Sequence, residues 1–224
     1  MKILVIGGTR GLGQAVVRAA FEAQHTLTVL ARHVGDFEAP VSGVRMVVGD
    51  AGDAADVERA IAGQDAVVWT VGVAPTRRPV HVFSRGTQYM LASMERCGVR
   101  RLLCVTGVGV GDSKGQGSFL QAAIMQPLLR RTIFDDKNRQ EAQIRASALD
   151  WTIVRPAALA DGPATGAYAA LVLPDVAVAR RIRRADVAAF IVGNLDASRY
   201  LQKLVLLTTG AGGKQRAGMR GPVG

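Results

Sequence analysis

One stretch near the N-terminus decides the fold of this chain: KILVIGGTRGLG, residues 2–13. Its first part, residues 2–6, is a short run of apolar and β-branched residues, which is typical of a buried parallel strand. Its second part is rich in glycine, and residues 14–21 continue it with helical composition. A strand, a glycine-rich turn and a helix in this order are the first unit of a dinucleotide-binding domain.

The chemistry of such a turn explains the residues in it. Glycines let the backbone turn tightly and approach a pyrophosphate without an intervening Cβ. The helix that follows offers unpaired N–H groups and the positive end of its dipole to the same anion. We therefore expect this turn to bind a dinucleotide cofactor through Gly7, Thr9, Arg10, Gly11, Leu12 and Gly13.

Strands and helices alternate along the rest of the chain. Strands are predicted at 2–6, 26–31, 44–49, 65–71, 100–106, 151–155 and 203–208. Helices are predicted at 11–23, 54–62, 80–97, 134–148 and 185–195, with a further short helix at 117–131. The alternation predicts the α/β class: a single Rossmann-like, doubly wound parallel sheet in the order 3-2-1-4-5-6-7, with helices on both faces.

The length of 224 residues and the hydrophobic content of 49% favour one folded domain. We expect that domain to span 1–209, with a small substrate-pocket region at about 156–200. The remaining segment, 210–224, is rich in glycine and basic residues and lacks apolar periodicity, so it is predicted to be a flexible basic tail.

Composition argues against several classes of function. The net charge is +10, but the arginines form dispersed pairs without interleaved aromatic residues, so nucleic-acid binding is not favoured. No apolar stretch approaches the roughly 20 residues that cross a bilayer, and no cleavable signal is recognised. Cys97 and Cys104, expected to be buried and reduced, indicate a cytoplasmic protein. Metal-ligand spacing is lacking, and a monomer or weak dimer is expected.

The strand ends predict which cofactor is bound, because ligands of this fold lie at the carboxyl ends of the strands. Asp or Glu usually follows the second strand and holds a free ribose 2′-hydroxyl. This chain has Arg32 there, and Arg10 projects from the glycine turn. Two guanidinium groups favour a 2′-phosphate, and hence NADP(H) over NAD(H). The alternative is that both arginines are ordinary surface charges.

Other strand ends supply the remaining expected cofactor contacts: Asp50, Ala51, Val71, Gly72, Thr106, Pro156 and Ala157. Asp50 is placed to accept from the adenine amino group, and Thr106 to face the nicotinamide. The backbone at 156–157 would hold the carboxamide. The loop after the fourth strand, with Val73 and Pro75, is expected to line the substrate pocket.

Five stretches together resemble the atypical short-chain dehydrogenase/reductase family, in its NAD(P)H-binding branch: 7–13, 48–50, 86–87, 106–113 and 149–156. The resemblance extends to about residue 208. Asp135-Asp136 and the stretch 165–168 are similar to the flavin reductases, also called biliverdin reductases B. Within that likeness, Tyr168 is a candidate for the acceptor pocket, with plain packing as the alternative.

The chain departs from the wider family at its catalytic pair. Typical members use Tyr-x-x-x-Lys, in which the tyrosine transfers a proton and the lysine lowers the pKa of that tyrosine. No tyrosine of this chain has lysine four residues later, and Ile133 stands four residues before Lys137. Lys137 is left either as a ribose contact or as surface charge, and it joins Thr106 as a candidate catalytic residue.

These patterns lead to two hypotheses. The first is an NAD(P)H-dependent oxidoreductase that reduces a small-molecule acceptor, a flavin, quinone or similar conjugated molecule, because such acceptors can take their proton from solvent. The second is a non-catalytic NADP-binding protein with a redox-sensing or regulatory role. A sugar-nucleotide epimerase is disfavoured, because it would need the tyrosine–lysine pair and a larger C-terminal domain.

Overall fold

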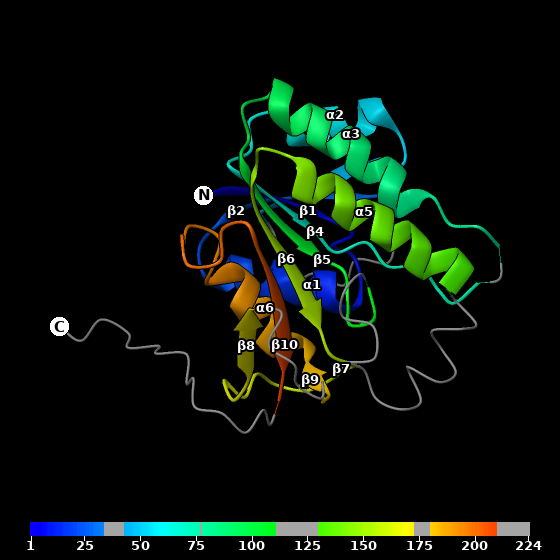
Figure 1. Cartoon of the computed structure of the whole chain (residues 1–224). Coiled ribbons are helices and arrows are strands. Elements are labelled where there is room, and N and C mark those ends of the chain that lie inside the picture. The colour runs from blue at the N-terminus through cyan, green and yellow to red at the C-terminus, as the bar shows by residue number, and fades with distance from the viewer. Residues whose placement is uncertain (34–42, 77, 111–129, 173–179, 210–224) are drawn as a thin grey trace.

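The computed structural model describes residues 1–33, 43–76, 78–110, 130–172 and 180–209, and Figure 1 shows how they are arranged. The tail expected at 210–224 and most of the short helix expected at 117–131 lie outside these residues. The strands are β1 (Lys2–Ile6), β2 (Thr26–Ala31), β3 (Val44–Val48), β4 (Ala66–Trp69), β5 (Arg101–Val105), β6 (Asp150–Pro156), β7 (Leu159–Ala160), β8 (Ala169–Val172), β9 (Ile182–Arg183) and β10 (Lys203–Thr208). The helices are α1 (Gly11–Glu22), α2 (Ala54–Ile61), α3 (Val82–Arg96), α5 (Asp135–Ala146) and α6 (Arg184–Val192).

The predicted sheet is confirmed, with one strand added at its edge. The main sheet has the order β3-β2-β1-β4-β5-β6-β10-β8, and its pairs are parallel as far as β10. The edge strand β8 runs antiparallel to β10, so the sheet is mostly but not wholly parallel. The sequence prediction missed β8 and the separate pair β7–β9, which lie close to glycine- and proline-rich turns and are four residues long or shorter.

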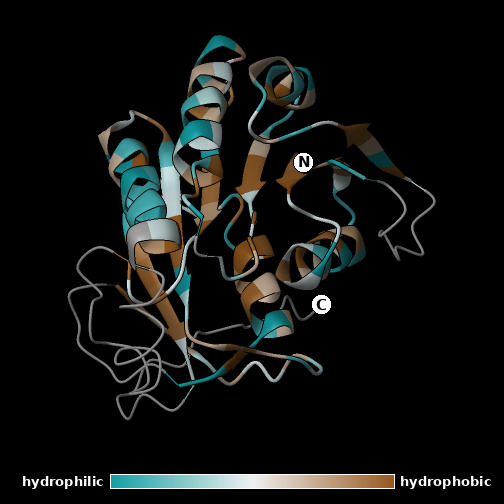
Figure 2. Ribbon diagram, turned by 90° about the vertical axis from the view of Figure 1, so that its right-hand side faces the viewer, coloured by the Kyte–Doolittle hydropathy of each residue, from teal (hydrophilic) through white to brown (hydrophobic). Residues whose placement is uncertain are grey.

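Helices cover both faces of the sheet (Figure 1), and each face has its own core. Helices α1 and α6 pack on one face, where the buried cluster includes Val5, Val16 and Phe190. On the other face α2, α3 and α5 enclose a cluster that includes Trp69 and Met90. The central strands are mostly apolar (Figure 2), and β4 is buried at every residue, as expected for strands covered on both faces.

Local signals in the sequence fix where the helices begin, end and pack. The carboxylate of Asp53 accepts from the Asp56 N–H at 3.0 Å and so caps α2. Gly63 and Gly98 take positive φ angles just after α2 and α3. Gly86 lets α3 approach the sheet, because a Cβ there would lie 2.5 Å from the Trp69 ring.

The arginines are not all solvated surface charges. Arg100 is exposed at the end of β5, but its neighbour Arg101 is only 8% exposed. The Arg101 guanidinium donates to the carbonyls of Leu195 (2.9 Å) and Asp150 (2.7 Å), and its burial lowers its pKa to about 10. Arg101 therefore ties β5 and β6 to the end of α6.

Both cysteines are free thiols, as expected, but only Cys104 is fully buried. Burial raises the pKa of the Cys104 thiol, which keeps it protonated and unreactive. Within the described ranges no group of ligand side chains could hold a metal ion. Nor does any helix in those ranges have the length and apolarity to cross a membrane.

Candidate cofactor and active site

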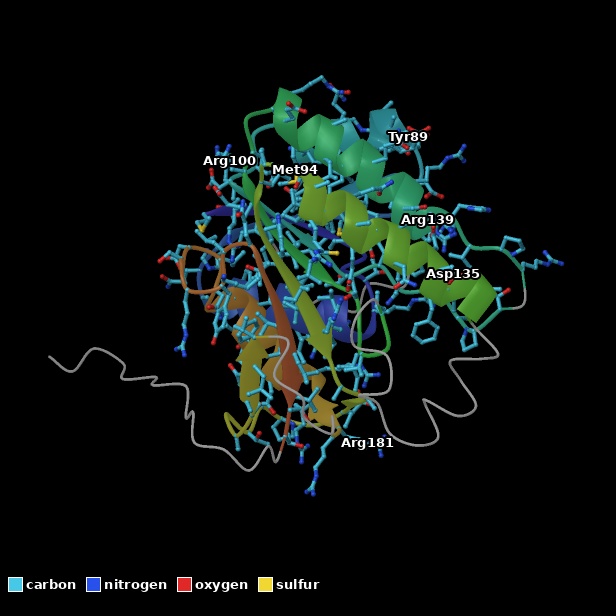
Figure 3. All side chains as sticks on the ribbon, viewed as in Figure 1. Tyr89, Met94, Arg100, Asp135, Arg139 and Arg181 are labelled. Carbon is cyan, nitrogen blue, oxygen red and sulfur yellow. The ribbon has the colours of Figure 1, made fainter. Side chains whose placement is uncertain are left out.

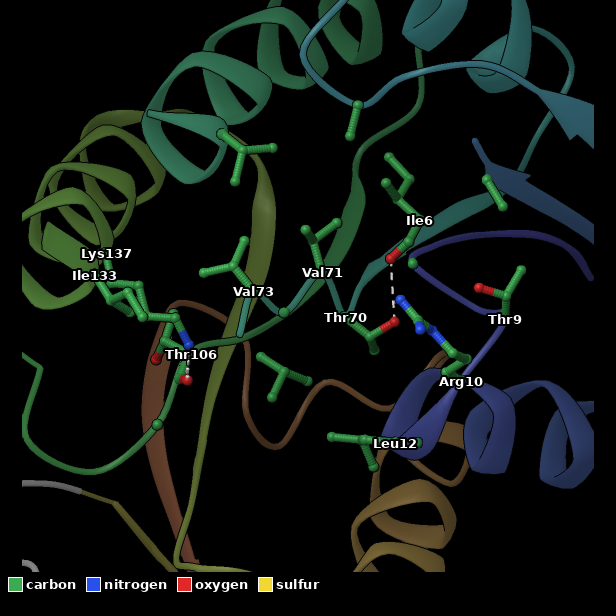
Figure 4. Close-up of a pocket in the computed structure, with 18 of the residues that line it drawn as sticks. Ile6, Thr9, Arg10, Leu12, Thr70, Val71, Val73, Thr106, Ile133 and Lys137 are labelled. Carbon is green, nitrogen blue, oxygen red and sulfur yellow. Dashed lines mark hydrogen bonds between the residues drawn. The ribbon is translucent and has the colours of Figure 1, made fainter. Parts of the chain in front are cut away.

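The glycine turn after β1 is packed so tightly that a side chain would not fit at Gly7 or Gly13. Gly7 has a φ of +87°, and a Cβ there would lie 2.8 Å from the Val71 backbone nitrogen. A Cβ on Gly13 would lie 2.1 Å from the carbonyl oxygen of Gly7. The Thr70 hydroxyl donates to the Ile6 carbonyl at 3.0 Å and joins the ends of β1 and β4 (Figure 4). The turn is thus fixed by backbone contacts, as a pyrophosphate cradle requires.

The start of α1 is suited to an anion. Its N-cap residue is Arg10, whose side chain makes no capping hydrogen bond, and the first turn contains no acidic residue. By contrast, α2 begins with the Asp53 cap and has Asp56 in its first turn. The N-terminal N–H groups and positive dipole end of α1 are therefore available to a ligand phosphate.

A cleft of about 1100 Å³ opens at the carboxyl ends of the central strands. It brings together most of the expected site residues: Gly7, Thr9, Arg10, Gly11, Leu12, Arg32, Asp50, Ala51, Val71, Gly72, Val73, Thr106, Lys137, Pro156 and Ala157. Figure 4 shows Thr9 and Arg10 at one end, and Thr106 and Lys137 at the other. Both expected functional ends therefore belong to one cavity.

Three expected site residues are not among those lining the cleft. Gly13 lies behind the turn, where its role is the close approach described above. Pro75 is exposed in the loop after β4. Tyr168 packs edge-on against Phe190, with ring centroids 6.3 Å apart, and burial raises the pKa of its phenol. This contact agrees with the packing alternative for Tyr168, and its role in the acceptor pocket stays a prediction.

The side chains around the cleft are mostly cationic where they are charged. Its lining includes Arg10, Arg32, Arg85, Lys137 and Arg184. The two acidic residues of the described lining are already engaged, since Asp53 caps α2 and Asp50 accepts from the Gly52 N–H at 2.8 Å. A cleft with this balance attracts a polyanionic ligand.

Lys137 is a half-buried cation on α5 that faces the cleft. Its Nζ donates to the Thr106 carbonyl at 2.5 Å and lies 5.0 Å from the centre of the Phe83 ring. Burial lowers the pKa of Lys137 below its ordinary value of 10.5, while Cys104 and Glu141 oppose that shift. Ile133, one turn earlier, also lines the cleft, so no tyrosine stands where the usual pair would place it.

Sequence reasoning missed the buried network behind Lys137. Glu141 and Arg155 are 3% and 0% exposed and form a two-pronged ion pair, with N–O distances of 3.0 and 2.5 Å. The Thr106 hydroxyl donates to the same carboxylate at 2.6 Å. The hydroxyl of Thr106 therefore points toward α5, and its expected approach to the nicotinamide stays a prediction. The available signal was Arg155, a charge that directly follows the apolar pair Ile153-Val154 in β6.

A second buried carboxylate positions α3 beside the cleft. Asp136 is fully buried and accepts from the Phe83 N–H at 2.9 Å and from the Ser84 N–H at 3.3 Å. It therefore caps α3 from the neighbouring helix α5. This contact fixes the first turn of α3, whose Arg85 lines the cleft near Lys137.

Comparison with known families agrees with this geometry. A family model described as NAD(P)H-binding matches residues 7–198. The chain belongs to the NAD(P)H-binding family. The resemblance inferred from the sequence motifs is thereby confirmed, and family membership supports a nicotinamide cofactor in the cleft.

Solved structures of similar fold include other proteins of this kind. ChuY, an anaerobillin reductase from Escherichia coli O157:H7, is 27% identical with a TM-score of 0.79, over 96% of this chain and 100% of that one. A wide-type short-chain dehydrogenase/reductase from Veillonella parvula, in complex with NADP, is 14% identical with a TM-score of 0.79, over 94% and 95%. A Rossmann-fold NAD(P)-binding family protein from Shigella flexneri is 21% identical with a TM-score of 0.73, over 96% and 97%. The last two structures show that the fold is shared. Together with the family match, they give this chain an NAD(P)H-binding oxidoreductase fold.

Proposed function

We propose that this protein is an NADPH-dependent reductase of a flavin, a quinone or a similar flat conjugated acceptor. The observation that carries the proposal is that one cleft joins the glycine turn at its first end to Lys137 at its second (Figure 4). The first end has the uncapped helix start that binds a pyrophosphate. The second has a cation beside an apolar wall formed by residues such as Val73 and Ile133.

The preference for NADPH over NADH rests on Arg10 and Arg32. Both line the cleft, on the glycine turn and just after β2. A 2′-phosphate offers them charge-assisted hydrogen bonds that a 2′-hydroxyl does not. Arg32 stands just after β2, at the position where an acidic residue usually holds a 2′-hydroxyl.

The chemistry divides between cofactor and protein. When bound, the cofactor supplies a hydride, which is the difficult part of the reduction. Lys137 stabilises negative charge that develops on the acceptor and donates a proton to it. Flavins and quinones also take protons from water, so a tyrosine acid is not required.

The acceptor end carries further positive charge. Arg85 on α3 and Lys137 on α5 both line the cleft, and Asp136 joins the first turn of α3 to α5. These two cations favour an acceptor that has an anionic group on a flat apolar body. Flavin mononucleotide and riboflavin form a matched pair for this point, because they differ only in a phosphate.

The proposal is tested by mixing purified protein with NADPH and a panel of flavins and quinones, while the absorbance of the reduced nicotinamide is followed. Loss of that absorbance with at least one acceptor, faster with flavin mononucleotide than with riboflavin, is the expected result. Tight NADPH binding without turnover on any acceptor would instead support a redox-sensing role.

A further inference from the structure

Arg184, the first residue of α6, lies beside the glycine turn although it is far from that turn in sequence. Its Nε lies 3.8 Å from where a Cβ on Gly11 would be, and the residue lines the cleft. Its side chain is 29% exposed. Helices α1 and α6 pack side by side on the same face of the sheet (Figure 1), which fixes this approach.

The present partner of Arg184 is a weak one. Its guanidinium pairs with the carboxylate of Asp161, whose side chain is 91% exposed. Exposed ion pairs contribute little and are screened by salt. The Asp161 segment does not depend on this pair, because Arg183 donates to the Asp161 carbonyl at 3.2 Å. Asp186 also accepts from the N–H groups of Thr165 (2.7 Å) and Gly166 (2.9 Å).

We propose that Arg184 binds the pyrophosphate of the cofactor and leaves Asp161 to do so. This inference rests on the proposed binding of a nicotinamide dinucleotide at the glycine turn. The turn and the start of α1 offer N–H groups to the pyrophosphate, and Arg184 adds a full positive charge with a forked set of donors. The Asp161 carboxylate is negatively charged, as the pyrophosphate is, so the two compete for the Arg184 guanidinium.

The proposal separates Arg184 from Arg32 by their effects on two cofactors. NADPH and NADH share the pyrophosphate but differ in the 2′-phosphate. Loss of the Arg184 charge should therefore weaken both cofactors by the same factor, whereas loss of Arg32 should weaken NADPH alone. Removal of the Asp161 charge should strengthen both, because the competitor is gone.

The experiment measures the Kd of NADPH and NADH by calorimetric titration for the full chain and four variants. Arg184→Gln should raise both Kd values about ten-fold, the loss typical of a charge-assisted hydrogen bond. Asp161→Asn should lower both Kd values, and Arg32→Gln should raise that of NADPH only. Arg181→Gln is the matched control, since it removes the same charge from a side chain that points away from the fold (Figure 3).

Three results would overturn the assignment: Kd values for Arg184→Gln within two-fold of the parent protein, a loss confined to NADPH, or an equal loss in Arg181→Gln. If Arg184→Gln fails to fold, Asp161→Asn decides alone, because unchanged or weaker binding in that variant contradicts the competition. A failure of the proposed function would look different from a failure of this assignment. In that case the parent protein would bind neither NADPH nor NADH, or it would bind them and reduce no acceptor.

Discussion

The two ends of the cleft are built by opposite means. At the glycine turn the shape is made by backbone, and the decisive contacts are those that a Cβ on Gly7 or Gly13 would obstruct. At the other end the shape is made by side chains from three elements, with Lys137 and Glu141 on α5, Thr106 after β5 and Arg155 on β6. The first end is therefore sensitive to added atoms, and the second to the loss of one charge from a buried network.

The largest effect is expected from breaking that network. Glu141→Leu removes the carboxylate that is paired with the buried Arg155 guanidinium, which costs about 3–5 kcal/mol of unfolding free energy. For a chain of this size the melting temperature should fall by about 6–20 °C. Thermal unfolding by circular dichroism measures it. The double variant Glu141→Leu/Arg155→Met is the control and should recover most of the loss; equal melting temperatures for the single and double variants would contradict the pairing.

The glycine-turn end is broken by one methyl group. Gly13→Ala places a Cβ against the Gly7 carbonyl, so the turn must shift at a cost of about 1–3 kcal/mol, and NADPH binding should fall below detection. Calorimetric titration and thermal unfolding check both effects. Gly193→Ala is the matched control, because it adds the same methyl group after α6, outside the cleft lining, at a φ of −68° where its nearest neighbour is the Ala189 carbonyl at 3.2 Å. Normal NADPH binding by Gly13→Ala would show that the turn is not the cradle.

The preference for NADPH over NADH tests the role of Arg32 at the glycine-turn end of the cleft. Arg32→Asp should raise the Kd of NADPH about 10–100-fold, the equivalent of one or two lost charge-assisted hydrogen bonds. The Kd of NADH should change little, because NADH lacks the 2′-phosphate. Titrations with both nucleotides measure this, and equal losses would remove Arg32 from the 2′-phosphate site.

A smaller, pH-dependent effect is expected at the Lys137 end. Burial lowers the pKa of Lys137, so its protonated form is lost as pH rises through that lowered value, below the ordinary 10.5. Turnover should therefore fall at alkaline pH, and Lys137→Met should remove this decline while lowering kcat about ten-fold. That is less than a typical acid contributes, because water also supplies protons. An alkaline decline that persists in Lys137→Met would assign it to another group.

The smallest effect is expected at Tyr168. Its ring packs on Phe190 outside the cleft lining, so Tyr168→Phe keeps the packing and removes only the hydroxyl. Steady-state kinetics with the best acceptor should stay within about two-fold of the parent protein, as for substitutions away from a site. A larger change in KM would return Tyr168 to the acceptor pocket.

The difference between the two ends also explains what the sequence could predict. Strand periodicity and the glycine pattern act locally, so the strand order through β10 and the cleft position of Gly7, Arg10 and Arg32 followed from them. Glu141 and Arg155 are 14 residues apart on different elements, so their pairing depends on how α5 packs on the sheet. The same holds for Tyr168, whose environment is decided by α6, and for the short strand β8.

The most direct test of the account is NADPH oxidation by the purified protein with flavin mononucleotide as acceptor, measured for the parent protein, Arg32→Asp and Lys137→Met. The account predicts turnover by the parent protein, a raised KM for NADPH in Arg32→Asp and a lowered kcat in Lys137→Met. Oxidation no faster than in buffer, with this and every other acceptor of the panel, would contradict the claim that the two ends of the cleft serve one reductase.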